Sequence, residues 1–287
     1  MQETLFPHEG TASNLSLLSV GVLSYRAHQT IERTLELHRK SGLSKLAAEF
    51  FIYFNALCPE DEQLAQAAGV AYRGSPENTG IYGGFRAIAE LAARPYVLIL
   101  ENDIVPLEGV DIAACLDSCL SDMREHGIKV FCLRSRAFPG QGGVQGKYVR
   151  CFQIHDAIDS GLKPGKPPAT SRLSMLLAHG YLSKFAGTAI YVEKSPEKAQ
   201  PHAIRKLPSG NYLTDSRFRN WSNQSVLVER DFFLNTICRR VVEKPDPRLV
   251  HGHQDIERAL NSWWWRRRRE PMGHAAQGVF THARLDR

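Results

Sequence analysis

The sequence lacks the patterns that mark a secreted or membrane-spanning chain. No apolar run approaches the roughly 20 residues that a transmembrane helix needs. The first ten residues, MQETLFPHEG, hold no basic segment followed by an apolar one. Its six cysteines form no CxxC pair, so we expect free thiols in a cytoplasmic protein and not a disulfide framework.

Two glycine-rich nucleotide fingerprints are also missing. No GxGxxG follows the first apolar run, which disfavours a Rossmann dehydrogenase. The segment after that run is SYRAHQT, without glycine, whereas a nucleotidyltransferase that makes an activated sugar usually carries a Gly-rich, basic phosphate loop there. The missing loop argues against such a nucleotidyltransferase. It remains an alternative function for the chain, as does a non-catalytic nucleotide-sugar-binding protein.

The composition is that of a globular protein with a mild basic excess. The 287 residues are 43% hydrophobic and carry a net charge of +6, which suits one large α/β domain or two small ones. The positive charge favours an anionic ligand or an anionic membrane surface. We expect no nucleic acid partner, because basic residues alternate with aromatic ones only in the run 263–269.

Apolar runs and helical periodicity alternate along the first hundred residues. Expected strands cover 15–23, 50–54, 70–72 and 96–100, and expected helices cover 30–40 and 60–68; a Gly-rich turn at 78–84 opens a third helix that runs through residue 92. This alternation predicts a doubly wound parallel sheet, which binds ligands at the carboxyl ends of its strands. Polar groups stand at three of these ends: Ser24-Tyr25-Arg26, Asn55 and Glu101-Asn102-Asp103.

The second half of the chain is richer in loops. We expect helices over 111–126 and 232–241 and strands over 129–134 and 188–192. The Gly- and Pro-rich segments 139–148 and 161–168 are expected to be loops. The change near residue 108 divides the chain into a nucleotide-binding half, 1–108, and a loop-rich, partner-specific half, 109–287.

Three motifs in the first half carry a family resemblance. LSVGVLSYRA, ENTGIYGGFRAIAE and YVLILEND occur in this order, over residues 15–108. In order and spacing they resemble the nucleotide-sugar-binding half of family-2-like GT-A glycosyltransferases. The resemblance implies a Rossmann-like, mainly parallel sheet flanked by helices, with a loop-rich C-terminal acceptor-binding portion. It also implies that the second half, 109–287, binds the acceptor and is the catalytic half of the same domain. Glu101 replaces the usual first Asp of the DxD motif, and Arg86 stands where many members have Asn.

The same resemblance implies roles for individual residues. Asp103 would bind Mn²⁺ or Mg²⁺, and a C-terminal histidine, His282, would return to that metal, with His253 and His274 as competitors. Asp255 would be the general base that deprotonates the acceptor, with Glu257 as the second candidate; Asp255 also suits a helix N-cap. The residues expected around the nucleotide sugar are Ser24, Tyr25, Arg26, Asn55, Asn78, Gly80, Arg86, Glu101 and Asn102.

The implied reaction moves a sugar from a nucleoside-diphosphate sugar, UDP-type, to a glycan or lipid-linked glycan acceptor, with inversion, in bacterial surface polysaccharide synthesis. Trp221, Asn223 and Gln224 are candidates for acceptor contact.

In the segment NSWWWRRRRE, helical spacing predicts a buried face. That face would hold Ile256, Leu260, Trp263 and Trp264. Trp265 would lie beside Arg266–Arg269. This group would either contact an anionic membrane surface from the cytoplasmic side or form a solvated, charged helix end that suits the helix dipole, and the arginines could instead bind a diphosphate. Pro271 would end the helix.

Overall fold

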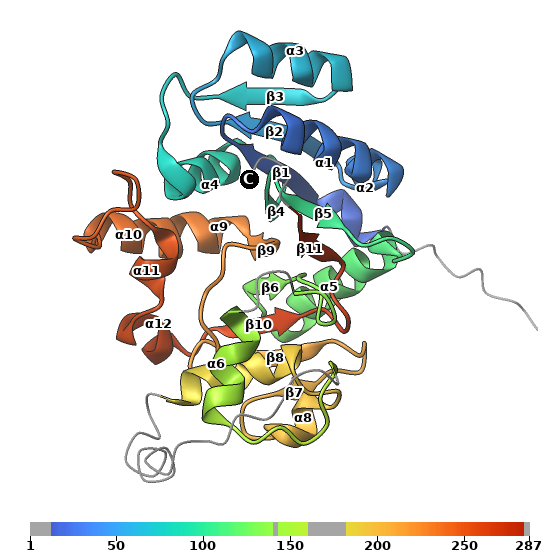
Figure 1. Ribbon diagram of the computed structural model, residues 1–287, viewed down its shortest axis with the longest axis vertical. Coiled ribbons are helices and arrows are strands. Elements are labelled where there is room, and N and C mark those ends of the chain that lie inside the picture. The colour runs from blue at the N-terminus through green and yellow to red at the C-terminus, as the bar shows by residue number, and fades with distance from the viewer. Residues whose placement is uncertain (1–12, 140–142, 160–181, 284–287) are drawn as a thin grey trace, which may run out of the picture.

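The computed structural model describes residues 13–139, 143–159 and 182–283 (Figure 1). Within them runs one nine-stranded sheet in the order β3-β2-β1-β4-β9-β6-β10-β8-β7. The pairings make β8 and β9 run against the other strands, so seven of the nine point the same way. The expected α/β fold, a mainly parallel sheet flanked by helices, is confirmed.

The first half follows the predicted alternation closely. Its elements are η1 Asn14–Leu17, β1 Leu18–Ser24, α1 His28–Lys40, α2 Leu43–Leu46, β2 Glu49–Phe54, α3 Pro59–Ala68, β3 Ala71–Gly74, α4 Gly80–Leu91 and β4 Tyr96–Glu101. The first strand begins three residues later than expected. The residues before it form a 3-10 turn that Ser13 caps through its side chain.

Side chains on the two faces of the sheet build two separate cores. In β4, Leu98 and Leu100 pack with α1, α2 and α5 (Ile112–His126), whereas Val97 and Ile99 pack with α4 and the helices after β9. Alternation along a strand therefore fills both faces, which is why the strand is apolar throughout. Gly21 in β1 lets α4 approach, because a Cβ there would lie 2.3 Å from Cγ2 of Ile88.

The second half adds strands on the far side of β4. Its remaining elements are β5 Ile104–Pro106, β6 Val130–Cys132, α6 Gly143–Cys151, η2 Leu182–Tyr191, α8 Pro196–Ala199, β7 Arg205–Lys206, β8 Tyr212–Asp215, β9 Val226–Glu229, α9 Arg230–Phe232, η3 Phe233–Cys238, α10 Arg239–Glu243, α11 Ile256–Leu260, α12 Trp263–Arg268, β10 Pro271–His274 and β11 Phe280–His282. The helix expected over 232–241 is present as the continuous run α9, η3 and α10. Among the described residues, no helix combines the length and apolarity needed to cross a bilayer.

Two expectations for this half are wrong. Part of the segment 139–148 belongs to α6 and is not a loop, and the expected strand 188–192 lies largely in the 3-10 helix η2. Tyr148, Ile190 and Val192 are buried together in a third apolar cluster. A short apolar run does not distinguish a strand from a buried helical turn, and tertiary packing overrides the weak local preference for a loop. The expected loop 161–168 lies outside the described residues.

The tryptophan run also differs from expectation. The single helix breaks at Asn261–Ser262 into α11 and α12. The Asn261 side chain pins the break by accepting from Trp221 N at 2.7 Å and donating to Trp221 O at 3.1 Å. The break changes the helical phase, so Trp265 is fully buried and Trp263 is 64% exposed. The predictions for these two tryptophans were therefore wrong.

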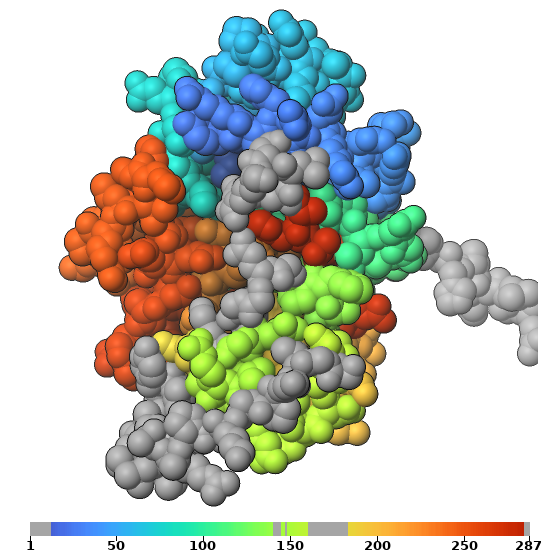
Figure 2. All heavy atoms as spheres, viewed as in Figure 1, coloured from blue at the N-terminus to red at the C-terminus, as the bar shows by residue number. Residues whose placement is uncertain are grey.

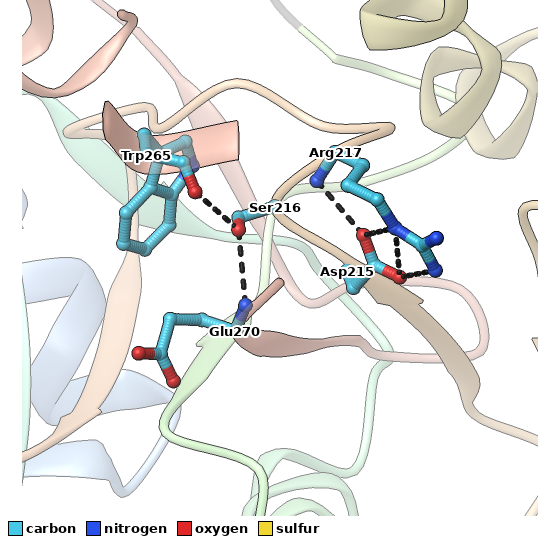
Figure 3. Close-up of polar contacts among 5 residues, drawn as sticks. All are labelled: Asp215, Ser216, Arg217, Trp265 and Glu270. Atoms are coloured by element: carbon cyan, nitrogen blue, oxygen red, sulfur yellow. Dashed lines mark hydrogen bonds and ion pairs between the residues drawn. The ribbon is translucent and has the colours of Figure 1, made fainter. Parts of the chain in front are cut away.

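A serine holds the end of α12 against the sheet (Figure 3). The Ser216 hydroxyl, just after β8, donates to Trp265 O at 2.6 Å and accepts from Glu270 N at 3.0 Å. Next to it, Arg217 donates to both carboxylate oxygens of Asp215. Arg269 ends the helix with a left-handed backbone (φ 55°), and β10 starts at Pro271, the residue expected to stop the helix.

Candidate active site

The acidic turn Glu101-Asn102-Asp103, at the end of β4, is held in place by two residues of α1. Thr34 donates its hydroxyl to Asn102 O at 2.6 Å, and one helical turn later His38 Nε2 lies 3.0 Å from Ile104 O. A carbonyl only accepts, so His38 carries a proton on Nε2. These two contacts fix the backbone on both sides of Asp103, which is 1% exposed.

His38 is a neutral, buried imidazole. It is fully buried and packs edge-on against Phe50. Burial lowers its pKa to about 4, and the hydrogen bond to Ile104 O opposes this only partly. At neutral pH the ring is therefore a fixed hydrogen-bond donor and adds no charge beside the acidic turn.

The C-terminal strand brings His282 to the acidic turn. β11 pairs antiparallel with β5, with His282 opposite Ile104, and Ala283 N donates to Asp103 O at 2.7 Å. As a result, Nε2 of His282 lies 3.2 Å from Oδ2 of Asp103, with 12% and 1% of the two side chains exposed. Figure 2 shows the red C-terminal residues set between the blue N-terminal elements and the green segment.

This pair suits a divalent cation. An imidazole nitrogen and a carboxylate oxygen are both ligands of Mn²⁺, and Mg²⁺ accepts the carboxylate while its other positions go to phosphate and water. Both side chains face each other at the carboxyl end of the sheet. Asp103 and His282 are therefore the residues that would hold the metal.

The two competing histidines lie elsewhere. His274 is fully buried at the end of β10, where Nδ1 lies 2.7 Å from Ala275 O. Burial, reinforced by Arg219, lowers the pKa of His274 well below its ordinary value. His253 packs against the start of α4, because a Cβ added at Gly80 would lie 2.4 Å from its Cβ.

The expected base and ribose residues surround the ends of β1 and β2. Ser24 is buried, and its hydroxyl has no hydrogen-bond partner among the described residues. Tyr25 is 43% exposed, with the Arg26 guanidinium 5.5 Å from its ring centroid. Arg26 has a positive φ of 46°, so the loop turns sharply here. The exposed Tyr25 ring can stack on a planar ligand, whereas the Ser24 hydroxyl would have to become accessible before it could bind one.

Asn55 and Asn78 shape the entry to α4. Asn55 Nδ2 donates to Gly80 O at 3.0 Å, and its Oδ1 accepts from Thr79 Oγ1 at 2.8 Å. Asn78 Oδ1 accepts from Gly80 N at 2.9 Å. Both asparagines thus engage the helix start, where they act as positioning residues. Gly80 has a φ of +71°, which a larger residue adopts only with strain.

Arg86 lies nearly two turns further along α4 in an exposed ion pair. Its Nε donates to Glu90 Oε1 at 2.8 Å, and both side chains are about half exposed. Glu90 raises the pKa of Arg86 above its ordinary value. The predicted contact of Arg86 with the nucleotide sugar would require this pair to open.

The two candidate bases begin α11. Asp255 is its N-cap and accepts from Glu257 N at 2.9 Å through Oδ1, while its Oδ2 lies 3.5 Å from Arg258 Nε. Glu257 accepts from Asn223 N at 2.9 Å. Asp255 follows His253 by two residues, and His253 contacts Gly80, so this helix start lies close to the entry of α4.

Trp221 is a core residue and not an acceptor-binding one. It is 2% exposed, stacks on Phe233 and meets Trp265 edge-on. Its indole N–H donates to Asn223 Oδ1 at 2.9 Å. The prediction that Trp221 stacks on a sugar is therefore wrong, and Asn223 is largely engaged in holding it. Gln224 is half-buried, and its Oε1 has no partner among the described residues.

Sequence reasoning missed a buried cationic cluster at the ends of β6 and β10. The guanidinium carbons of Arg134 and Arg219 lie 5.7 and 5.5 Å from the ring centroid of Tyr191. Arg219 Nη2 donates to Tyr191 Oη at 2.7 Å, while its Nη1 is buried and makes no hydrogen bond to a described residue. Burial alone would raise the pKa of Cys132, but Arg219 and the Tyr191 hydroxyl together lower it.

This cluster lies on the same sheet edge as the acidic turn. Arg134 bridges to Phe280, two residues before His282. Its members come from three separate segments, around β6, in η2 and after β8, so no local sequence motif predicts the cluster. A guanidinium group with a spare donor, as Arg219 has in Nη1, can bind an anionic group such as a phosphate.

Comparisons with known proteins give only distant structural matches. No protein family model matches the chain, and no curated protein matches it. A mannosyltransferase from Pyrobaculum calidifontis, solved with GDP-Man and Mn²⁺, is 12% identical with a TM-score of 0.35, over 42% of this chain and 36% of that one. Glucosyl-3-phosphoglycerate synthase from Mycobacterium tuberculosis, solved with Mn²⁺ and UDP-Glc, is 15% identical with a TM-score of 0.36, over 47% and 48%. The chain thus matches less than half the length of either protein, and its function is inferred from the site itself.

Proposed function

We propose that the protein is a metal-dependent glycosyltransferase that moves a sugar from a nucleoside-diphosphate sugar, UDP-type, to a glycan or lipid-linked glycan. The observation that carries this proposal is the pairing of Asp103 with His282 at 3.2 Å, at the carboxyl end of the sheet. That edge is where open α/β sheets bind their ligands. Bound there, Mn²⁺ or Mg²⁺ supplies positive charge to the leaving diphosphate.

The residues around this pair suit binding of the nucleoside-diphosphate sugar. The exposed Tyr25 ring and the unsatisfied Ser24 hydroxyl suit a base and a ribose. Asn55 and Asn78 set the backbone at the start of α4, and Thr34 and His38 set the backbone around Asp103. A backbone held in place before the donor arrives loses little conformational entropy when the ligand binds.

The acceptor is activated from α11. Asp255 takes the proton of the acceptor hydroxyl as that oxygen attacks the anomeric carbon, and Glu257 is the alternative base. Attack opposite the leaving diphosphate inverts the anomeric centre. The cationic cluster of Arg134 and Arg219 favours an acceptor that carries phosphate, as a lipid-linked glycan does. Such an acceptor is consistent with a role in bacterial surface polysaccharide synthesis at the membrane face.

A thermal-shift screen tests the proposal. Nucleoside-diphosphate sugars are added to the wild type and to Asp103→Asn, each with and without Mn²⁺. We expect one UDP-type sugar to raise the Tm of the wild type only when Mn²⁺ is present, and to have no such effect on the variant. If no nucleotide sugar stabilises the wild type, the transferase proposal is wrong. Stabilisation without turnover of any glycan acceptor would favour the non-catalytic alternative.

A further inference from the structure

Three side chains with metal-binding groups meet at a point that the proposed reaction does not use. His28 is the first residue of α1, Cys58 directly precedes α3, and Asp61 lies in the first turn of α3. His28 Nε2 is 3.0 Å from Asp61 Oδ1 and 3.8 Å from Cys58 Sγ, and Cys58 Sγ is 3.2 Å from Asp61 Oδ2. The three ligand atoms therefore surround one small volume.

The geometry differs from that of a catalytic Cys-His-Asp relay. Such a relay uses both imidazole nitrogens, one facing the thiol and the other facing the carboxylate. Here the same nitrogen, Nε2 of His28, faces both Cys58 and Asp61. A metal ion is bound by donor atoms that converge on one point. A proton relay instead needs the two imidazole nitrogens to face different groups.

The distances and the donor types match zinc. Zinc bond lengths of about 2.0–2.3 Å at tetrahedral angles place neighbouring ligand atoms roughly 3.3–3.6 Å apart. The three observed separations, 3.0, 3.2 and 3.8 Å, bracket this range, so small side-chain movements suffice. One thiolate and one carboxylate also neutralise a divalent charge, which matters because Asp61 is 1% exposed.

Before a metal ion binds, the Cys58 thiol keeps its proton: the backbone hydrogen bond with Asp61 lowers its pKa, but burial and the Glu60 and Asp61 side chains outweigh this and raise it. Both α1 and α3 point their N-termini at the cluster, and helix N-termini stabilise an anionic ligand once the metal has displaced that proton. Without metal, Asp61 accepts from Cys58 N at 3.1 Å and closes a capping box. That contact positions Asp61 Oδ2 in advance beside Cys58 Sγ.

We propose that Cys58, His28 and Asp61 form a Zn²⁺ site that is separate from the Asp103–His282 site. Binding replaces the Cys58 thiol proton, which leaves to solvent, and uses His28 as the neutral tautomer protonated on Nδ1. Water completes the tetrahedron. The ion ties the start of α1 to the start of α3, beside the loops that follow β1 and β2. A thiolate selects zinc over Mg²⁺, so the two sites take different metals.

A second group, Asp122, Glu125 and His126 on α5, is a weaker candidate. Asp122 Oδ2 already accepts from Ser209 and Asn211, both at 2.7 Å. Glu125 is exposed to solvent and has no thiolate beside it.

Cobalt substitution tests the zinc site without relying on transferase activity. The full chain is stripped with a chelator and titrated with Co²⁺, and thiolate-to-cobalt charge-transfer absorption is recorded; Zn²⁺ is then added in competition. We expect one equivalent of Co²⁺ to produce this absorption and Zn²⁺ to abolish it. Cys58→Ser should lose the absorption, whereas Cys151→Ser, a half-buried thiol elsewhere, should keep it.

Two further variants keep the test decisive. His28→Gln alters a side chain that is 41% exposed, so the fold should tolerate it, and Co²⁺ affinity should fall at least about tenfold. Asp103→Asn should leave the absorption unchanged. If the wild type shows no thiolate-to-cobalt absorption, or if Cys58→Ser retains it, the site does not exist as proposed.

Discussion

Asp103 and His282 come from distant parts of the chain, yet Oδ2 of one lies 3.2 Å from Nε2 of the other. The antiparallel pairing of β11 with β5 creates this contact, and the backbone bond from Ala283 N to Asp103 O closes it. The pairing is structural, and a carboxylate and an imidazole held together at the ligand-binding edge could also bind a divalent cation.

Loss of either ligand should weaken metal binding. We expect His282→Ala to reduce Mn²⁺ affinity by at least about tenfold, since even indirect partners of metal ligands contribute that much. Asp103→Asn should have the larger effect, because it also removes the charge. Calorimetric titration with Mn²⁺ measures both. His274→Ala is not a suitable control because its ring is buried, so His202→Ala, an exposed histidine between α8 and β7, serves instead. Equal Mn²⁺ affinity in all four proteins would refute the assignment.

Asp255 allows its two roles to be separated. Asparagine caps a helix as well as aspartate does but is not a base. Asp255→Asn should therefore unfold at nearly the same denaturant concentration as the wild type and keep its donor affinity. Its kcat should fall by about 10²–10⁴. Glu257→Gln is the matched variant; if it loses kcat while Asp255→Asn does not, Glu257 is the base.

His38 should make the protein less stable in mild acid. Its pKa is lowered from 6.5 to about 4 by burial, so between these values the unfolded chain binds a proton that the native protein does not. The free energy of unfolding therefore falls as the pH drops from about 6.5 towards 4, and this contribution is complete above pH 6.5.

The measurement is urea unfolding at a series of pH values for wild type and His38→Gln. Glutamine keeps a donor for Ile104 O but does not titrate. We expect the free energy of unfolding to fall less steeply with decreasing pH in the variant than in the wild type. Between pH 6.5 and 4 the difference should be on the order of 1–3 kcal/mol. Identical pH profiles would show that His38 is not the titrating group.

Gly80 should be intolerant of a side chain for two reasons that a control can separate. Its φ is +71°, and a Cβ there would lie 2.4 Å from the Cβ of His253. Gly69 has a similar φ of +65° but nothing within 4 Å of its added Cβ. Gly69→Ala should cost about 1 kcal/mol of stability from backbone strain alone.

Gly80→Ala should cost clearly more than Gly69→Ala and should also weaken nucleotide-sugar binding, because it displaces the His253 loop from the start of α4. Chemical unfolding and donor titration measure the two effects. Equal costs for both substitutions would mean that the His253 contact yields without penalty.

The surface around Trp263 should bind anionic membranes weakly. Trp263 is 64% exposed, and Arg266 lies over its ring at 5.4 Å. We expect co-sedimentation with phosphatidylglycerol vesicles at low salt but not with phosphatidylcholine vesicles. Trp263→Ser should reduce it, while Phe138→Ser, an aromatic residue 65% exposed elsewhere, should not. Equal binding to phosphatidylglycerol and phosphatidylcholine vesicles would contradict the prediction.

Local sequence was sufficient for the first half of the fold. Burial of a strand or of one helix face sets the spacing of apolar residues within that segment. This spacing is readable in β1, β2 and β4 and in α1, α3 and α4. Prediction from local sequence failed where contacts with distant segments decide which structure a segment adopts. The phase of α12 depends on the Asn261–Trp221 contact, and η2 is helical because Tyr148 and Ile190 pack together.

The sequence by itself therefore determined the α/β alternation and the polar residues that end its strands. Only the tertiary structure decided which distant groups meet at those ends. It brought His282 to Asp103 through β11, gathered Arg134 and Arg219 around Tyr191, and set His28 against Cys58 and Asp61. The reason is physical: periodicity records whether a residue is buried, but contacts between separate segments depend on strand order and register, which no single segment encodes.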